Sequence, residues 1–200
     1  MTERAFVLGL SGIPGSGKTT LTKLLLKAFS QARVVYYDAF QTITTMPPER
    51  VRDWFGRGAD PNEFPLAELV AELTRQSQFR PAGPGRPVVI FESPFGRVHR
   101  ATGAFIDFLV WVDTPLDVAL SRATLAFLRT AQREQLPNAA AEFIQWQTQY
   151  MVNYPLIRPM YLAQRQQISA SADLVLDGLK SPEESASRIK EALAPHSIEP

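Results

Sequence analysis

Residues 9 to 20 read Gly-Leu-Ser-Gly-Ile-Pro-Gly-Ser-Gly-Lys-Thr-Thr, and this stretch constrains the fold more than any other part of the chain. It contains the pattern G-x-x-x-x-G-K-[ST] over residues 12–19, in which glycines let backbone N–H groups turn inward around an anion. The apolar run 6–10 predicts a buried strand, and leucines at helical spacing predict a helix over 20–29. Strand, loop and helix in this order predict a site for a nucleoside triphosphate.

The residue types within the loop suit that ligand. Lys18 offers a compact cation to the outer phosphates, and the hydroxyl of Thr19 is a ligand for Mg²⁺. The first turn of the following helix favours negative charge. We therefore predict that the nucleotide is contacted by Gly12, Pro14, Gly15, Ser16, Gly17, Lys18, Thr19 and Thr20.

The rest of the chain alternates strand and helix patterns, which predicts a single α/β domain over residues 1–200. Strands are expected at 33–37, 87–92, 108–113 and 172–177, and helices at 66–79, 116–127, 139–154 and 182–192. Pro155 and Pro159 are expected to break or kink the third of these helices. Residues 41–65 are predicted to form an irregular, variable substrate loop in which Trp54 either packs or stacks on substrate, and the tail 196–200 is expected to fray.

Two acidic residues stand where predicted strands end, and the carboxyl ends of parallel strands meet at one edge of a sheet. Asp38 is a candidate base for an acceptor hydroxyl, an Mg²⁺ ligand acting through water, or a turn residue. Glu92 is a candidate Mg²⁺ ligand, directly or through water, or else an exposed strand-end residue. In the loop that follows, Arg97 and His99 are candidate substrate or phosphate contacts, although either also fits a structural role.

Basic residues are spaced along the helix predicted after Thr114-Pro115, a typical helix start. Arg122, Arg129 and Arg133 share one helical face, which predicts a lid over about residues 126–139. Arginines on such a lid neutralise the charge of a moving phosphoryl group, or they form an ordinary solvated face. Asp113 reads as a turn or capping residue.

Composition excludes several classes of function. A net charge of +1 without a basic run does not fit a general nucleic-acid binder, and no apolar stretch approaches the length of a membrane span. The chain has no cysteine, so thiol catalysis, thiolate metal sites and disulfides are excluded. We expect a cytoplasmic protein without a signal peptide that acts on a small-molecule substrate, with no nucleic-acid or membrane partner; homo-oligomerisation is left open.

Several segments beyond the loop resemble the uridine–cytidine kinases, in the group that includes phosphoribulokinase and pantothenate kinase. Residues 36–40, Tyr-Tyr-Asp-Ala-Phe, resemble their D-S-F-Y segment, and Phe91-Glu92 resembles their E-G strand end. Residues 109–122 are similar to their F-V-D-T…L-x-R-R stretch. The elements Q-Y, K-P-x-F and A-D-V-I have counterparts in the same order at 149–150, 158–161 and 172–175. The resemblance covers about residues 5–178.

This resemblance implies a P-loop NTPase fold with a five-stranded parallel sheet, a helical lid, and ATP with Mg²⁺ as phosphoryl donor. Its acceptor is a hydroxyl of a nucleoside or a similar small molecule. By position it makes Asp38 the base, with Phe40 beside it, Thr19 and Glu92 the metal side, Arg122 a lid arginine and Gln149 a substrate contact.

The chain departs from the family at Ser93, Ala123 and Ala126, and its 41–65 segment matches poorly. These departures leave two alternatives to a nucleoside kinase. One is a kinase of a non-nucleoside metabolite, such as a sugar, a vitamin precursor or an amino-acid derivative. The other is a nucleotide-binding switch or accessory protein that hydrolyses ATP slowly.

Overall fold

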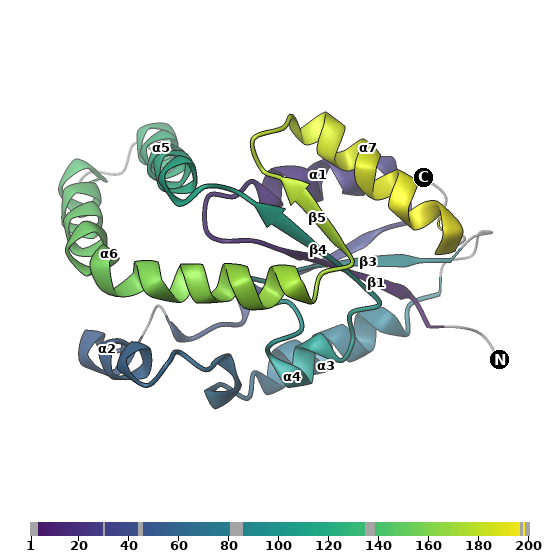
Figure 1. The fold of residues 1–200 in the computed structure, drawn as a ribbon, viewed down its shortest axis with the longest axis horizontal. Helices are drawn as coiled ribbons and strands as arrows, with labels where there is room; N and C mark the ends of the chain where they lie inside the picture. Colours follow the sequence, from purple (N-terminus) through teal and green to yellow (C-terminus); the bar gives the residue numbers. More distant parts are fainter. Residues whose placement is uncertain are drawn as a thin grey trace.

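The strands of the protein form one parallel sheet in the computed structural model, which describes residues 4–29, 31–43, 46–80, 86–134, 139–196 and 198 (Figure 1). In chain order they are β1 (Phe6–Ser11), β2 (Arg33–Tyr36), β3 (Val88–Glu92), β4 (Phe108–Asp113) and β5 (Leu174–Asp177). Their spatial order is β2-β3-β1-β4-β5, and every neighbouring pair is parallel. The predicted five-stranded parallel sheet is therefore confirmed. β1 and β3 are buried throughout, which is why they read as unbroken apolar runs.

Helices cover both faces of this sheet. One face is covered by α1 (Lys18–Ala28) and α7 (Pro182–Leu193), which contact each other and supply Leu21, Leu25, Ile189 and Leu193 to one apolar core. The other face carries α3 (Ala67–Ser77), the short α4 (Arg100–Gly103) and α6 (Ala139–Ala170). Their core includes Leu69, Leu73, Trp111 and Ile168. α5 (Leu116–Glu134) packs along α6.

The segment predicted to be irregular over 41–65 is partly helical. It contains α2 (Pro48–Gly56) and a 3₁₀ turn, η3 (Pro61–Glu63), so the prediction of a structureless loop was wrong. Pro48 occupies the first helical position, where its missing N–H costs nothing. Trp54 is 3% exposed, and its indole N–H donates to the Asp60 carbonyl at 2.9 Å. Trp54 therefore packs inside this segment and does not stack on substrate.

α6 continues through both of its prolines. Pro155 and Pro159 lie inside the helix, so they do not end it, and Figure 1 shows that α6 changes direction along its length. A proline removes one backbone hydrogen bond and crowds the preceding turn, which bends a helix. The prediction of a kink fits this course, whereas a break at this point was wrong.

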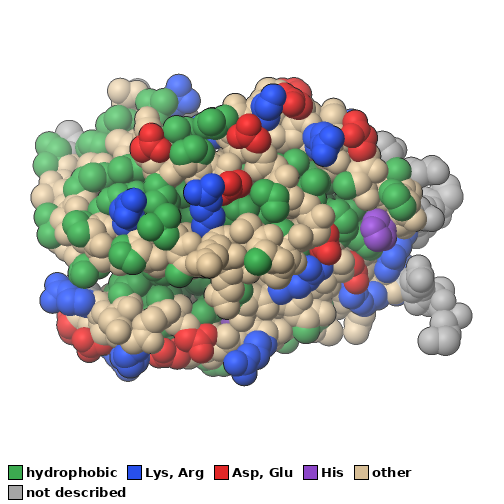
Figure 2. Space-filling view, viewed as in Figure 1, with side chains coloured by type: hydrophobic (Ala, Val, Ile, Leu, Met, Phe, Trp, Pro, Cys, Tyr) green, Lys and Arg blue, Asp and Glu red, His purple; other side chains and the backbone are tan. Residues whose placement is uncertain are grey.

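Several apolar side chains of α6 are exposed, and Figure 2 shows apolar residues gathered over α5 and α6. They include Ile144, Met151, Val152, Leu156 and Leu162.

The predicted lid falls at the junction of α5 and α6. Its described part consists of the last turns of α5 and the first residue of α6, and residues 135–138 lie outside the described chain.

The C-terminal tail packs against the start of the sheet. The ring of His196, in the turn η4 (Ala194–His196), lies 5.2 Å from that of Phe6 and 5.7 Å from that of Phe108. Ile198 is 3% exposed. The expectation of a frayed tail was therefore wrong for these two residues, because the tail completes the apolar core beneath α7. None of the described helices is long and apolar enough to cross a membrane.

Candidate functional site

The loop between β1 and α1 is shaped by two glycines in the left-handed region. Gly15 has φ +80° and Gly17 has φ +101°, conformations that other residues adopt only with strain. A Cβ built on Gly15 would collide with the carbonyl of Ala119 in α5, and one built on Gly12 would lie 2.5 Å from the Ser16 hydroxyl. Only glycine fits at 12 and 15, and the backbone therefore curls tightly at the sheet's carboxyl edge.

Lys18 bends back over this loop. Its ammonium donates to the carbonyls of Gly12 at 2.7 Å and Ile13 at 3.0 Å. Burial lowers the pKa of Lys18, and the negative charges of Glu92 and then Asp38 act in the opposite direction. Both strand-end carboxylates are therefore close enough to the loop cation to stabilise its charge.

Glu92 is joined to the first helix by two hydrogen bonds. It ends β3, is 7% exposed, and accepts hydrogen bonds from the hydroxyls of Thr19 at 2.7 Å and Thr22 at 3.0 Å. Hydroxyl and carboxylate oxygens are the ligands that Mg²⁺ prefers in proteins, so Thr19 and Glu92 fit this cation. The sequence analysis missed Thr22, which is fully buried. Its signal was a polar residue on the apolar face of the first helix, between Leu21 and Leu25.

Asp38 lies at the end of the neighbouring strand. Tyr36 at the end of β2 pairs with Glu92, and Asp38 follows in the turn η1 (Tyr37–Ala39). Its carboxylate is exposed, whereas the preceding Tyr37 is 3% exposed and packs its ring against Phe95 at 5.3 Å. The buried tyrosine anchors the turn, so that the carboxylate of Asp38 stays at the sheet edge.

A phosphate group fits the base of the loop. The hydroxyl of Ser16 is buried and has no hydrogen-bond partner in the described part of the chain. Buried polar groups in folded proteins are almost always paired, so such a group is available to a ligand oxygen. The Ser16 carbonyl is held from the other side by the hydroxyl of Thr114 at 3.3 Å, a second residue that the sequence analysis missed.

Beside the loop lies a small cavity of about 230 Å³, lined by Ser16, Gly17, Thr20, Arg122, Lys180 and Pro182 among others. Arg122, on α5, is tethered there because its guanidinium donates to the carbonyl of Gly178 at 2.8 Å. Arg129 is also exposed on α5, but seven residues, or about 10 Å, further along the helix axis. The structure thus places Arg122 next to the loop and Arg129 towards the end of α5.

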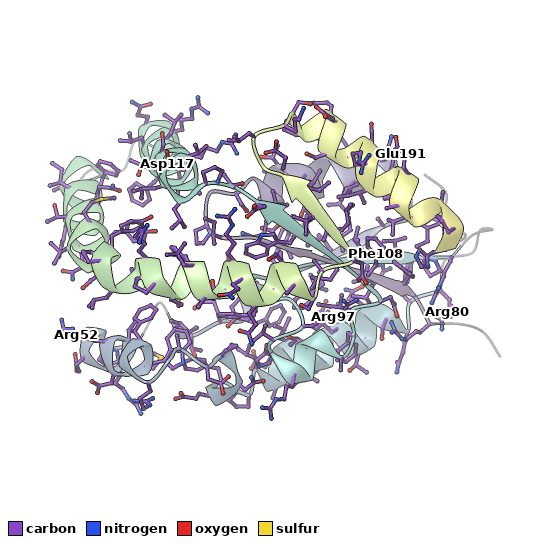
Figure 3. The ribbon with its side chains drawn as sticks, viewed as in Figure 1. Arg52, Arg80, Arg97, Phe108, Asp117 and Glu191 are labelled. Atoms are coloured by element: carbon purple, nitrogen blue, oxygen red, sulfur yellow. The ribbon has the colours of Figure 1, made fainter. Side chains whose placement is uncertain are left out.

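Arg97 lies at the wrong edge of the sheet for a phosphate contact. Its guanidinium binds Asp173 at 2.6 Å and the carbonyls of Ser171 and Asp107 at 2.9 and 3.3 Å. Asp107 and Asp173 directly precede β4 and β5, and Figure 3 shows Arg97 near Phe108, the first residue of β4. A phosphate contact does not fit this position of Arg97, because the chain after β3 returns across the sheet face towards the opposite edge. Its role as a substrate contact stays a prediction.

His99 is enclosed by the protein. It is 1% exposed, and its two ring nitrogens lie 2.8 Å from the Thr102 hydroxyl and 2.9 Å from the Phe64 carbonyl. It also occupies the N-cap of α4. Because both nitrogens are already paired, we leave His99 out of the proposed site.

Replacing His99 by Ala is expected to lower the free energy of unfolding by about 1–3 kcal/mol, because the buried hydroxyl and carbonyl lose their partner. Urea denaturation monitored by tryptophan fluorescence measures this change. Turnover per folded molecule is expected to stay at the wild-type value. A tenfold loss of turnover without loss of stability would restore His99 as a substrate contact.

Two further candidates have no described contact with the loop. Phe40 follows the Asp38 turn and packs, half-buried, against the core under α6. Gln149 is exposed on α6. The substrate roles of Phe40 and Gln149 stay predictions.

Asp113, read as a turn or capping residue, ends β4 and pairs with Arg165 of α6 at 2.6 Å.

No family model matches the chain, and no curated protein matches its sequence. Among solved structures, shikimate kinase from Aquifex aeolicus is 17% identical, with a TM-score of 0.49 over 96% of this chain and 99% of its own. A shikimate kinase from Acinetobacter baumannii in complex with shikimate is 14% identical, with a TM-score of 0.48 over 98% of this chain and 97% of its own. A sugar kinase from Janibacter sp. is 18% identical, with a TM-score of 0.49 over 97% of this chain and 95% of its own. Likenesses this distant add nothing on function, which is argued from the site itself.

Proposed function

We propose that this protein is a kinase that transfers the γ-phosphoryl group of ATP to a hydroxyl group of a small molecule. The observation that supports this most is the placement of two carboxylates. Glu92 ends β3, and Asp38 follows the end of the adjacent strand β2, so both lie at the edge of the sheet where Lys18 sits in the loop. A protein that only binds nucleotide needs a loop and a cation, whereas transfer to an alcohol also needs a base placed to receive a proton.

The residues divide into four roles. The loop amides and Lys18 would hold the phosphates, Thr19 and Glu92 would hold Mg²⁺, Arg122 would cover the nucleotide from α5, and Asp38 would act on the acceptor. Bound ATP supplies the phosphoryl group, and Mg²⁺ neutralises the charge on its oxygens. Asp38 orients the acceptor hydroxyl and takes its proton. Most of the rate enhancement then comes from positioning and fixed charge.

For the acceptor we propose a nucleoside, uridine or cytidine, on the resemblance of residues 36–40 and the later segments. A non-nucleoside alcohol is the second candidate. It is favoured because Arg97 and His99, two of the predicted substrate contacts, are both engaged by the protein instead.

Incubation with ATP, Mg²⁺ and a panel of alcohols tests this function. The panel holds uridine, cytidine, free hexoses and pentoses, pantothenate and shikimate, and the readout is ADP release together with the mass of the phosphorylated product. We expect one acceptor class to give stoichiometric ADP and phosphomonoester. Tight ATP binding with slow hydrolysis and no transfer to any acceptor would support the nucleotide-binding switch and contradict the kinase.

Replacing Glu92 by Gln is expected to raise the Mg²⁺ concentration for half-maximal turnover about 10- to 100-fold, because the charge that orients Thr19 towards the cation is lost. Titration of Mg²⁺ at saturating ATP measures it. Glu68→Gln on α3 removes an exposed carboxylate of the same kind and is the matched control. An unchanged Mg²⁺ requirement in Glu92→Gln would leave Glu92 with only a structural role.

A further inference from the structure

A second cavity lies apart from the phosphate loop. It has a volume of about 480 Å³ and opens between the C-terminal half of α6 and the segments 58–62 and 95–100. Its lining includes neither Asp38 nor Glu92 nor any residue of the loop. A volume of this size falls within the range of small-molecule sites. It therefore lies outside the proposed nucleotide site.

The walls of this cavity are held in place before any ligand binds. Asn62 joins two of them, because its amide donates to the carbonyl of Val98 at 3.1 Å and accepts from the backbone N–H of Arg100 at 2.8 Å. Phe95 and Ile168 form an apolar floor that the protein itself already packs, at 5% and 0% exposed, and the half-buried Val98 and Met160 are apolar lining that a ligand can reach. A ligand would thus meet a preformed site and lose little free energy in ordering it.

Two glutamines on α6 supply polar groups to the wall of this cavity. Gln164 and Gln167, one helical turn apart, both line the cavity. In the described part of the chain neither side-chain amide has a hydrogen-bond partner. Each amide carries both donor and acceptor atoms, so it pairs best with another amide-type edge that offers the same two groups.

The charges in the cavity are balanced. Hydrogen bonds from Asn62 lower the pKa of Asp60, and the positive charge of Arg100 lowers it further, so these two lining residues bring opposite charges to the cavity. Arg97, also in the lining, is paired with Asp173. The net field therefore favours an uncharged ligand over an anion or a cation.

We propose that this cavity is a second binding site, for a small uncharged heteroaromatic molecule with an amide-type edge. Its ring lies against Val98 and Met160, and its polar edge meets Gln164 and Gln167. Apolar side chains and the methionine thioether pack favourably against an aromatic ring, and the glutamine amides fix the ring's orientation. The site stands whether or not the protein proves to be a kinase, since it shares no residue with the nucleotide site.

Ligand-observed saturation-transfer NMR on the full chain tests the site with uracil and nicotinamide as neutral probes and benzoate as an anionic ring of similar size. We expect the neutral probes to bind with a Kd of about 1 mM, as suits ligands of so few atoms.

Gln164→Ala combined with Gln167→Ala is expected to weaken binding about threefold to tenfold. Ala163→Phe, which fills the cavity from α6, is expected to abolish it. Gln166→Ala, exposed on the same helix but outside the lining, is the matched control and is expected to bind like the wild type.

Three results would overturn the proposal: saturable binding that Ala163→Phe does not reduce, benzoate binding as tightly as uracil and nicotinamide, or no saturable binding of either neutral probe. Asp38→Asn separates the two sites. It is expected to leave probe binding unchanged, and loss of binding in this variant would assign the probes to the acceptor site instead. Thermal unfolding of each variant confirms that the chain remains folded.

Discussion

Replacing Lys18 by Ala is expected to reduce kcat about 10³-fold at saturating ATP, and so to abolish measurable phosphoryl transfer. The ammonium of Lys18 is the loop's own cation, held over the carbonyls of Gly12 and Ile13. During transfer, charge accumulates on the oxygens that this cation faces, and no other lysine of α1 lies at the loop. Coupled-assay turnover, measured with the acceptor found in the panel, gives the effect.

The fold is expected to survive this change. The variant keeps the glycines at 12, 15 and 17 and the Thr114 contact that shape the loop, and it loses only the two hydrogen bonds from the ammonium. Lys23→Ala removes an exposed lysine from the same helix and is the matched control. Near-normal turnover in Lys18→Ala, with circular dichroism unchanged, would refute the loop's catalytic role.

Replacing Asp38 by Asn is expected to lower kcat about 10²-fold or more, because the amide keeps the shape of the carboxylate but does not accept the acceptor's proton. The KM for ATP is expected to change little, since Asp38 lies on the acceptor side of the loop. The two effects together separate loss of proton transfer from loss of nucleotide binding. Steady-state kinetics with ATP and acceptor varied independently measure both.

Asp53→Asn is the matched control for this change, because Asp53 is exposed on α2 and ends no strand. It is expected to have wild-type kcat. If Asp38→Asn also has wild-type kcat, Asp38 is only a structural residue of the turn η1 and the transfer reaction needs another base. A rise in the KM for ATP with kcat unchanged would instead make Asp38 part of the nucleotide site.

The inner strands of the sheet could be predicted because they are buried on both faces. Runs such as Val88–Phe91 admit no polar residue, and a short apolar run between turn signals has few other structures available to it. The loop could be predicted because its glycines are typical of a backbone with positive φ, which the structure shows at Gly15 and Gly17. The joint placement of Asp38 and Glu92 followed from the rule that parallel strands end at one edge.

The errors arise where the outcome depends on contacts distant in sequence. Pro47-Pro48 is equally typical of a loop and of a helix start. α2 is stabilised by the packing of Trp54 against Phe64, a residue that lies beyond the end of the helix. The segment after Glu92 carries no periodic pattern, so its course back across the sheet face could not be predicted from the sequence. Arg97 therefore reads as a phosphate contact from its place after a strand, and its pairing with Asp173 is 76 residues away in the chain.

The central claim is that the loop over residues 12–19 holds a triphosphate and that Asp38 and Glu92 face it from two adjoining strands. A crystal structure with Mg²⁺ and a non-hydrolysable ATP analogue tests it most directly. The account predicts that the outer phosphates contact the loop amides and Lys18, that the cation lies between Thr19 and Glu92, and that the carboxylate of Asp38 points at the terminal phosphate. An analogue bound elsewhere, or an Asp38 carboxylate turned away from that phosphate, would contradict it.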